Sequence, residues 1–379
     1  MRYYLIAGEP SGDLHGSNLM KELKKSDPQA EFRFWGGDKM AEVGGAENLV
    51  RHYRQTSFFG FVQVIKNLRT IFRQEADCRH DIEEYKPDAV ILIDYPGFNM
   101  RIAEFAHRRG FRVFYYIAPK VWAWKEWRVK GLRKFVDRLF IIFPFEVDYF
   151  RSKGIDAVFC GNPLADSISE RRKMLPLPEE FRREHSLDER PTVALLAGSR
   201  RAEVNDNLPN MVALAKRFPD RQFVVAGVSW LERDIYDRII GESGVKYVCD
   251  RTYELLSIAE AAVVTSGTAT LETALLNVPE MVVFKVPYLY EKLKHIVLKI
   301  PYVSLVNINL GRECVREMVT ADFDLDAAET ELVSLLEGGS KREKMLADFD
   351  ELRTIIGSDG VAERFAARMV AELKNELEQ

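Results

Sequence analysis

Short runs of apolar residues recur along the chain, and most are followed by a polar turn and a segment with helical spacing. In the amino half these runs cover residues 3–7, 32–37, 89–93, 111–117, 140–143 and 157–160. In the carboxyl half they cover residues 193–197, 222–226, 245–249, 261–265 and 281–284. Near-continuous apolar strands that alternate with helices are typical of a parallel sheet covered on both faces. We therefore predict an α/β fold of the doubly wound type.

This pattern of apolar runs and helical segments begins twice, once in each half of the chain. Residues 195–198 repeat the apolar-then-glycine order of residues 5–8, and a charged, proline-containing stretch separates the two halves. We predict two Rossmann-like doubly wound domains that face a cleft, residues 1–165 and residues 166–358. Helical apolar spacing in residues 359–379 predicts a C-terminal helix that packs back on the first domain. Ligands are expected at the carboxyl ends of strands that face the gap between the halves.

Composition excludes several classes of protein. A length of 379 residues favours two domains, and 47% apolar with 30% charged residues indicates a soluble globular protein. The four cysteines lie far apart, which favours a reducing compartment without disulfides or a zinc site. No two histidines stand at metal-binding spacing, so no metal is expected. Without a signal-peptide pattern or an apolar run of about 18 residues, we expect a cytoplasmic protein.

Two corners of the second half, each a strand, a glycine-bearing turn and a helix, suit an anionic ligand. Glycine allows close backbone approach, and the N–H groups at a helix N-terminus favour a phosphate. Arginine adds bidentate contact with a diphosphate. The simpler alternative is that each turn only caps its helix. The residues concerned are Gly198, Ser199, Arg200, Ser266, Gly267, Thr268 and Glu272.

Neither half carries the glycine pattern of a dinucleotide-binding turn or a P-loop, so no cofactor is expected. In the first half, Asp94 ends an apolar strand, where a partly desolvated carboxylate can act as a general base on an alcohol. A structural or helix-capping acid is the equal alternative. A second polar turn at the same sheet edge contains Glu9, Ser11, Gly12 and Asp13.

A basic, phenylalanine-rich segment is the most unusual part of the chain. No acidic residue occurs from Arg51 to Gln74. Helical spacing places Phe58, Phe61, Val62, Ile65, Leu68 and Phe72 on one face, which favours a membrane-surface or acyl-chain-binding helix. An ordinary core-facing helix remains the alternative. A second basic and aromatic cluster suits a phosphorylated headgroup, and it contains Lys120, Trp122, Trp124 and Arg128. No nucleic-acid motif accompanies the charge, so nucleic acid is not expected as a partner.

Five segments, in the same order, resemble motifs of the lipid-A-disaccharide synthase family, and the resemblance covers nearly the whole chain. They are Gly8-Glu9-Pro10-Ser11-Gly12-Asp13, Ile93-Asp94-Tyr95-Pro96-Gly97-Phe98-Asn99, Pro119-Lys120-Val121-Trp122-Ala123-Trp124, Leu196-Ala197-Gly198-Ser199-Arg200 with Glu203, and Ser266-Gly267-Thr268-Ala269-Thr270-Leu271-Glu272. The chain departs from the family pattern at Pro10, Val306 and Thr320, whereas Asn307 matches it.

The resemblance implies a GT-B glycosyltransferase, peripheral on the inner face of the inner membrane. Its reaction joins UDP-2,3-diacylglucosamine to 2,3-diacylglucosamine 1-phosphate, giving the β-1,6-linked lipid A disaccharide 1-phosphate and UDP. By the same resemblance Asp94 is the general base, Glu272 meets the ribose, and Arg200 with the two turns holds the diphosphate. Asn307 belongs to a segment with nucleotide contacts. The 58–72 helix takes the acyl chains, and nearby basic residues take the acceptor phosphate.

Two other functions fit the same sequence features. A UDP-sugar 2-epimerase has the same two-domain scaffold but needs no acyl-binding helix. A non-catalytic, sugar-nucleotide-binding membrane scaffold binds without turnover. Whether the chain forms a homodimer stays open.

Overall fold

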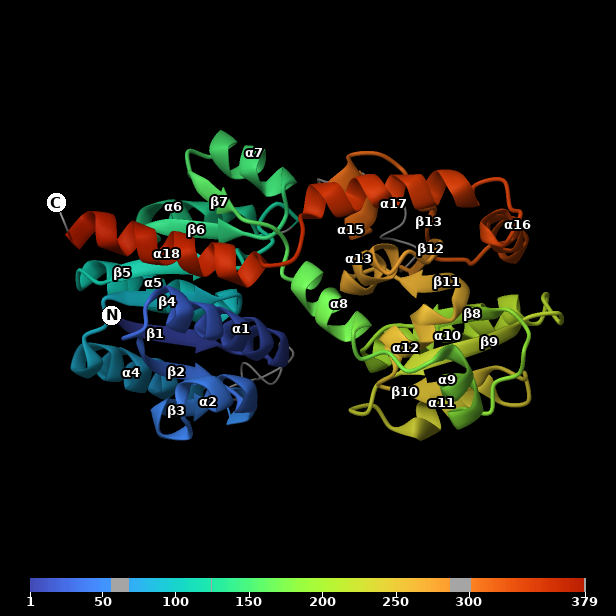
Figure 1. Cartoon of the computed structure of the whole chain (residues 1–379), viewed down its shortest axis with the longest axis horizontal. Coiled ribbons are helices and arrows are strands. Elements are labelled where there is room, and N and C mark those ends of the chain that lie inside the picture. The colour runs from blue at the N-terminus through green and yellow to red at the C-terminus, as the bar shows by residue number, and fades with distance from the viewer. Residues whose placement is uncertain (56–67, 124, 287–300, 378–379) are drawn as a thin grey trace. The chain divides into compact units, whose positions relative to one another are not determined.

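The computed structural model describes residues 1–55, 68–123, 125–286 and 301–377. The chain divides into two compact units (Figure 1). Unit 1 contains Met1–Asp166 and Gly357–Gln379, and unit 2 contains Ser167–Ile356. Each unit is built on one parallel sheet with helices on its faces, so the predicted fold class is confirmed.

Unit 1 holds a seven-stranded sheet in the order β3-β2-β1-β4-β5-β6-β7. Its strands are β1 (Arg2–Ala7), β2 (Glu31–Gly36), β3 (Leu49–His52), β4 (Ala89–Ile93), β5 (Arg112–Tyr116), β6 (Arg138–Ile141) and β7 (Ala157–Phe159). Its helices are α1 (Pro10–Ser26), α2 (Asp38–Gly44), α4 (Leu68–Tyr85), α5 (Pro96–Arg108), α6 (Val129–Phe135), α7 (Phe145–Ser152) and α18 (Val361–Leu377). The sequence pattern did not predict β3, because this edge strand has four residues and none of them is fully buried.

Unit 2 holds a six-stranded sheet in the order β10-β9-β8-β11-β12-β13. Its strands are β8 (Thr192–Leu196), β9 (Gln222–Gly227), β10 (Lys246–Cys249), β11 (Ala259–Thr265), β12 (Glu280–Lys285) and β13 (Glu317–Thr320). Its helices include α9 (Pro178–Glu184), α10 (Arg201–Ala215), α11 (Arg233–Ile240), α12 (Thr252–Ser257), α13 (Thr268–Leu275), α15 (Leu305–Leu310), α16 (Leu325–Leu335) and α17 (Arg342–Ile356). The short strand β13 was also missed. In both units the first strand of the sheet lies between the second and the fourth, which is the Rossmann order.

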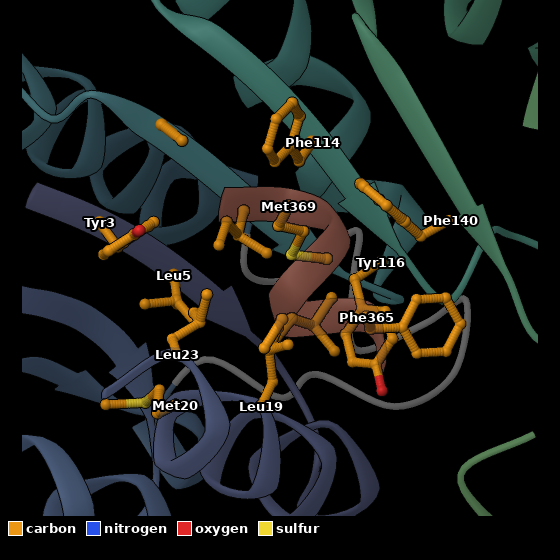
Figure 2. Packing of buried hydrophobic residues seen from close by; sticks show 14 of the residues in the cluster. Tyr3, Leu5, Leu19, Met20, Leu23, Phe114, Tyr116, Phe140, Phe365 and Met369 are labelled. Atoms are coloured by element: carbon orange, nitrogen blue, oxygen red, sulfur yellow. The ribbon is translucent and has the colours of Figure 1, made fainter. Parts of the chain in front are cut away.

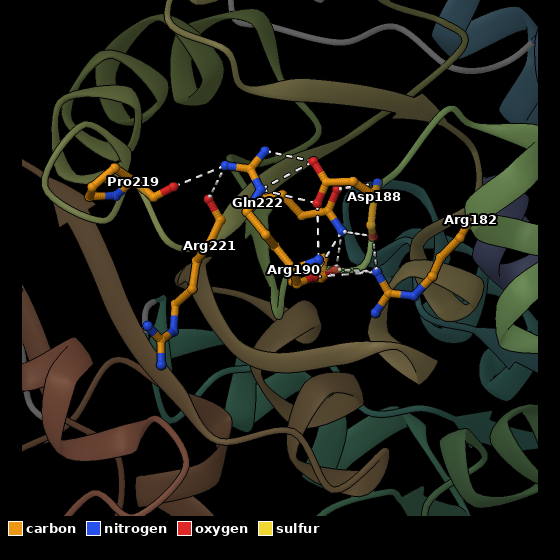
Figure 3. Close-up of polar contacts among 7 residues, drawn as sticks. Arg182, Asp188, Arg190, Pro219, Arg221 and Gln222 are labelled. Atoms are coloured by element: carbon orange, nitrogen blue, oxygen red, sulfur yellow. Dashed lines mark hydrogen bonds and ion pairs between the residues drawn. The ribbon is translucent and has the colours of Figure 1, made fainter.

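The helix α8 (Leu164–Arg172) carries the chain from unit 1 into unit 2. Shortly after it, a polar cluster fixes the amino ends of β8 and β9 (Figure 3). The Gln222 amide donates to the carbonyls of Asp188 and Arg190 at 2.8 and 3.0 Å. Arg190 in turn pairs with Asp188 at 2.7 Å and donates to the Pro219 carbonyl at 3.0 Å. This cluster lies at the strand starts, so it supports the sheet at the end opposite the predicted ligand edge.

The C-terminal helix packs on unit 1, as predicted. Phe365 and Met369 of α18 are fully buried in the cluster that includes Leu5, Leu19 and Tyr116 (Figure 2). The Phe365 ring meets the Tyr116 ring edge-on, with centroids 5.0 Å apart. Residue alternation along β1 divides its side chains between this cluster and a second one on the other sheet face. None of the described helices combines the length and apolar character needed to cross a membrane.

Candidate functional site

In unit 1, strained backbone marks the carboxyl ends of two neighbouring strands. Asp94 and Tyr95, directly after β4, have φ values of 43° and 47°. Ile117, directly after β5, has a φ of 62°. Left-handed conformations are uncommon for residues other than glycine, and they cluster at functional sites. Strained backbone thus gathers at the sheet edge where the general base is expected from the sequence.

Three groups hold the peptide of Asp94 in place. The Tyr115 hydroxyl donates to its carbonyl at 2.6 Å, and the Asn99 amide donates to the same carbonyl at 2.8 Å. The Asp94 N–H donates to the Tyr116 carbonyl at 3.1 Å. Both Tyr115 and Asn99 are fully buried. Sequence reasoning missed Tyr115, although a tyrosine inside an apolar strand was a usable signal because a buried hydroxyl needs a partner.

The Asp94 carboxyl group itself lies half-buried at this edge. Burial, and to a smaller extent the nearby Glu9 carboxylate, raise its pKa to about 6. Lys120 and the Tyr95 N–H act in the opposite direction. Such a group is ionised at neutral pH and still basic enough to accept a proton from a hydroxyl.

Residues 8–13, predicted as a polar turn, have two separate roles, and the helix α1 already begins at Pro10. A Cβ on Gly8 would lie 2.3 Å from the Tyr95 ring, so only glycine permits this approach to the residue after Asp94. Asp13 is buried, and its carboxylate accepts the N–H groups of Gly37 (2.7 Å) and Met40 (3.1 Å) at the start of α2. The structure thus gives Asp13 a helix-capping role, whereas Ser11 is exposed and Glu9 precedes α1 at the sheet edge.

The predicted acceptor cluster separates into buried and exposed members. Trp122 is 7% exposed, and its indole N–H donates to the buried Glu146 at 2.8 Å. Lys120 is exposed, and the Arg128 guanidinium lies 5.6 Å from the centre of the Trp127 ring. Trp127, which the sequence places within the same basic and aromatic cluster, has a side chain that is 69% exposed. Trp124 lies outside the described residues.

Most of the predicted acyl-binding face lies outside the described residues, namely Phe58, Phe61, Val62 and Ile65. Leu68 is the first residue of α4. Phe72, one turn later, is 58% exposed and has the Arg101 guanidinium 5.6 Å from its ring centre. Phe72 therefore presents an aromatic surface with an adjacent positive charge.

In unit 2, the turn after β8 already contains an anion, the Glu203 carboxylate. It accepts the N–H groups of Ser199 and Arg200 at 3.0 and 3.2 Å and pairs with the Arg200 guanidinium at 2.9 Å. Gly198 has a φ of 104°, and a Cβ there would lie 2.6 Å from Glu203. Arg200 remains 81% exposed. The sequence pattern indicated free amides at this turn, whereas the structure shows a carboxylate that holds them.

The second corner, between β11 and α13, leaves its helix N-terminus open. Gly267 has a φ of 152°, and no side chain caps the first turn of α13. The Ser266 hydroxyl donates to the Val303 carbonyl at 2.9 Å, and Thr268 is exposed. Glu272 accepts the Tyr253 hydroxyl at 2.7 Å, and its pKa is raised mainly by burial. Sequence reasoning missed Tyr253, which lies 19 residues away on another helix.

Asn307 has a structural role in unit 2, because its side chain makes hydrogen bonds to residues 314–317. Its amide donates to the Val315 carbonyl at 2.8 Å and to Glu317 at 2.9 Å, and its oxygen accepts the N–H groups of Cys314 and Val315. These bonds use the whole hydrogen-bonding capacity of the side chain. Within the described residues no group of three or more His, Cys, Asp or Glu side chains gathers as metal ligands do.

Two Rossmann-like units of this kind have the architecture of the GT-B fold. The solved UDP-GlcNAc 2-epimerase from Neisseria meningitidis bound to UDP-GlcNAc matches with a TM-score of 0.65 at 13% identity, covering 99% of this chain and 100% of that one. The glycotransferase of kitacinnamycin matches with a TM-score of 0.62 at 15% identity, covering 98% and 99%. At these identities the likeness is one of fold.

The family model described as Lipid-A-disaccharide synthetase matches residues 3–364. The lipid-A-disaccharide synthase of Geobacter sulfurreducens is 34% identical over 99% of this chain and 98% of its own length. That of Geobacter metallireducens is 35% identical over 96% and 95%. The chain belongs to the lipid-A-disaccharide synthase family, and it is a hexosyltransferase of lipid A biosynthesis.

Proposed function

We propose that the chain joins UDP-2,3-diacylglucosamine to 2,3-diacylglucosamine 1-phosphate, producing the β-1,6-linked disaccharide 1-phosphate and UDP. The placement of Asp94 is the observation that carries this proposal. It combines a braced, strained backbone with a half-buried carboxylate whose pKa is about 6. A general base of this kind suits an alcohol acceptor.

In the proposed reaction, the Asp94 carboxylate accepts the proton of the acceptor 6-hydroxyl. The hydroxyl oxygen then forms a bond to the anomeric carbon of the donor, and the bond from that carbon to the UDP oxygen breaks. UDP leaves with the electron pair. In-line attack inverts the configuration, which accounts for a β linkage from an α-linked sugar nucleotide.

Unit 2 is proposed to hold the donor. The open N-terminus of α13 at Gly267 and Thr268, together with Arg200, offers positive potential to the diphosphate, and this stabilises charge on the leaving UDP. A phosphate uses the Ser199 and Arg200 N–H groups only when it displaces the Glu203 carboxylate that accepts them in this structure. Glu272, which accepts a hydrogen bond from the Tyr253 hydroxyl, lies one turn into α13. It is proposed to accept hydrogen bonds from the ribose hydroxyls of UDP.

Unit 1 is proposed to hold the acceptor and to meet the membrane. Exposed Lys120 and, eight residues later, Arg128 suit the acceptor phosphate, and the exposed rings of Phe72 and Trp127 suit the headgroup region of a bilayer. This division assigns residues 1–165 with 359–379 to the acceptor and residues 166–358 to UDP. It also makes the chain a peripheral protein of the inner face of the inner membrane.

The decisive experiment measures UDP release in mixed micelles that contain the diacylated donor and the monophosphate acceptor. Release is expected only when both are present, and Asp94→Ala is expected to abolish it while UDP affinity stays near that of the wild type. An absence of release under conditions where UDP binds would overturn the proposal. Interconversion of UDP-GlcNAc and its 2-epimer would instead support the epimerase alternative, and binding without turnover would support the scaffold alternative.

A further inference from the structure

Glu146 is a buried carboxyl group in the same unit as the proposed base, and the proposed reaction gives it no role. It lies in the first turn of α7 and is 1% exposed. Its Oε1 accepts the indole N–H of Trp122 at 2.8 Å. Its Oε2 accepts the backbone N–H groups of Phe143 at 3.1 Å and Ile142 at 3.3 Å. Three donors therefore converge on one carboxyl group.

This arrangement joins two separate loops of unit 1. Trp122 belongs to the segment that follows β5, and its ring packs edge-on against Phe145 with centroids 4.9 Å apart. Ile142 and Phe143 belong to the turn between β6 and α7. The Glu146 bonds thus fix the segment after β5, which begins at the strained Ile117, against the turn after β6.

Lys120 connects this arrangement to the proposed base. It lies two residues before Trp122, and its ammonium group is 5.9 Å from the centre of the Phe143 ring. The charge of Lys120 lowers the pKa of both Asp94 and Glu146. Glu9 is the other charged group that acts on Asp94, whereas Lys120 is the charged group that acts on Glu146.

The three bonds to Glu146 favour its ionised form. Both of its oxygens act as acceptors, and a proton on either one weakens that oxygen as an acceptor of an N–H group. Burial raises the pKa of Glu146 to about 7, although the Trp122 and backbone N–H donors lower it. The connection between Glu146 and Trp122 is therefore sensitive to pH near neutrality.

We propose that Glu146 is a positioning residue for the transfer reaction, which holds Trp122 and thereby keeps Lys120 beside Asp94. This inference rests on the proposed function. It adds a second carboxyl group that must be ionised for turnover, although this group touches neither substrate nor the reacting atoms.

The test is the pH profile of kcat/KM for the wild type and for Glu146→Gln. In the wild type, log kcat/KM is expected to fall with a slope of about 1 below pH 7 and about 2 below pH 6, since two groups must lose protons. Glu146→Gln is expected to lower the plateau about 10- to 100-fold and to leave a slope of about 1, due to Asp94 alone. Trp122→Phe keeps the aromatic ring, removes the N–H donor and is expected to lower the plateau about tenfold.

Asp81→Asn is the matched control, because Asp81 is a buried carboxylate of the same unit that accepts the Tyr4 hydroxyl at 2.7 Å and pairs with Arg33. It is expected to lower thermal stability and keep the limiting slope of 2. A wild-type profile retained by both Glu146→Gln and Trp122→Phe would overturn the inference. The inference would also be overturned if Asp81→Asn lowered the limiting slope of log kcat/KM against pH from 2 to 1. A wild-type protein without UDP release would instead refute the proposed function itself.

Discussion

Asp94 combines a strained backbone with a carboxyl group that burial makes less acidic. A left-handed conformation costs about 1–3 kcal/mol per residue, and Asp94 shares it with Tyr95. The hydrogen bonds from Tyr115 and Asn99 offset that cost and fix the direction of the side chain. A residue that only capped α5 would need neither the strain nor the burial, and no side-chain hydrogen bond caps that helix.

Asp94→Asn is therefore expected to stabilise the protein at neutral pH while it abolishes turnover. The folded state holds the Asp94 proton up to about pH 6, whereas the unfolded chain releases it near pH 3.8. Between these values the native state binds more protons, so wild-type stability falls as pH rises, by about 1–3 kcal/mol in total. Urea unfolding at pH 4 and pH 7.5 measures this. Equal stability of variant and wild type at pH 7.5 would show that burial does not penalise the ionised carboxylate.

Arg200 provides a test of the donor site by substitution of a single residue. Arg200→Ala is expected to weaken UDP binding by about 1.5–3 kcal/mol, as for a hydrogen bond between charged groups. Its neighbour Arg201 pairs with Glu232 at 2.6 Å and is the matched control, for which UDP affinity should not change. Calorimetric titration with UDP separates the two. Equal losses in both variants would point to the general positive charge of the turn, and no loss would remove Arg200 from the donor site.

At the scale of elements, the sequence pattern predicted the long buried strands and the corners after β4, β8 and β11, because an apolar run followed by a polar, glycine-bearing turn is a local signal. It missed β3 and β13, because each has four residues and at most one of them is buried. It also missed the partners of the site residues. Glu146 lies 24 residues from Trp122, and Tyr253 lies 19 residues from Glu272, so no local spacing relates them.

The contact between α1 and α2 is another feature that local sequence spacing did not predict, and it can be tested. Asp13 of α1 accepts three N–H groups at the start of α2, from Gly37, Lys39 and Met40. Asp13→Ala leaves these buried donors without a partner and is expected to cost about 2–4 kcal/mol of stability. The KM for the acceptor should stay unchanged in the folded fraction. An acceptor KM raised at full stability would instead restore the sequence-based assignment of Asp13 to the acceptor site.

At the scale of the whole molecule, the last residue before the chain leaves unit 1 contacts the segment with which the chain returns to that unit. Asp166, within α8, accepts the N–H groups of Gly360 at 2.7 Å, Val361 at 3.1 Å and Ala362 at 2.9 Å. It thereby caps α18, the helix that completes unit 1. Helical spacing in the sequence was sufficient to predict this return, because a helix with one apolar face must bury it. The capping role of Asp166 was not predictable, since its partners lie almost 200 residues later.

Because α18 belongs to the core of unit 1, damage to it should destabilise that unit and spare the other. Phe365→Ala removes a fully buried ring that contacts Tyr116 and Phe140, and it is expected to cost about 3–5 kcal/mol. Hydrogen exchange in moderate urea should show lost protection in β1 and β4, with β8 and β11 still protected. Leu332→Ala, in the core of unit 2, is the matched control and should give the reverse pattern. Loss of protection in all four strands in both variants would show that the units unfold together, and that α18 stabilises the whole molecule.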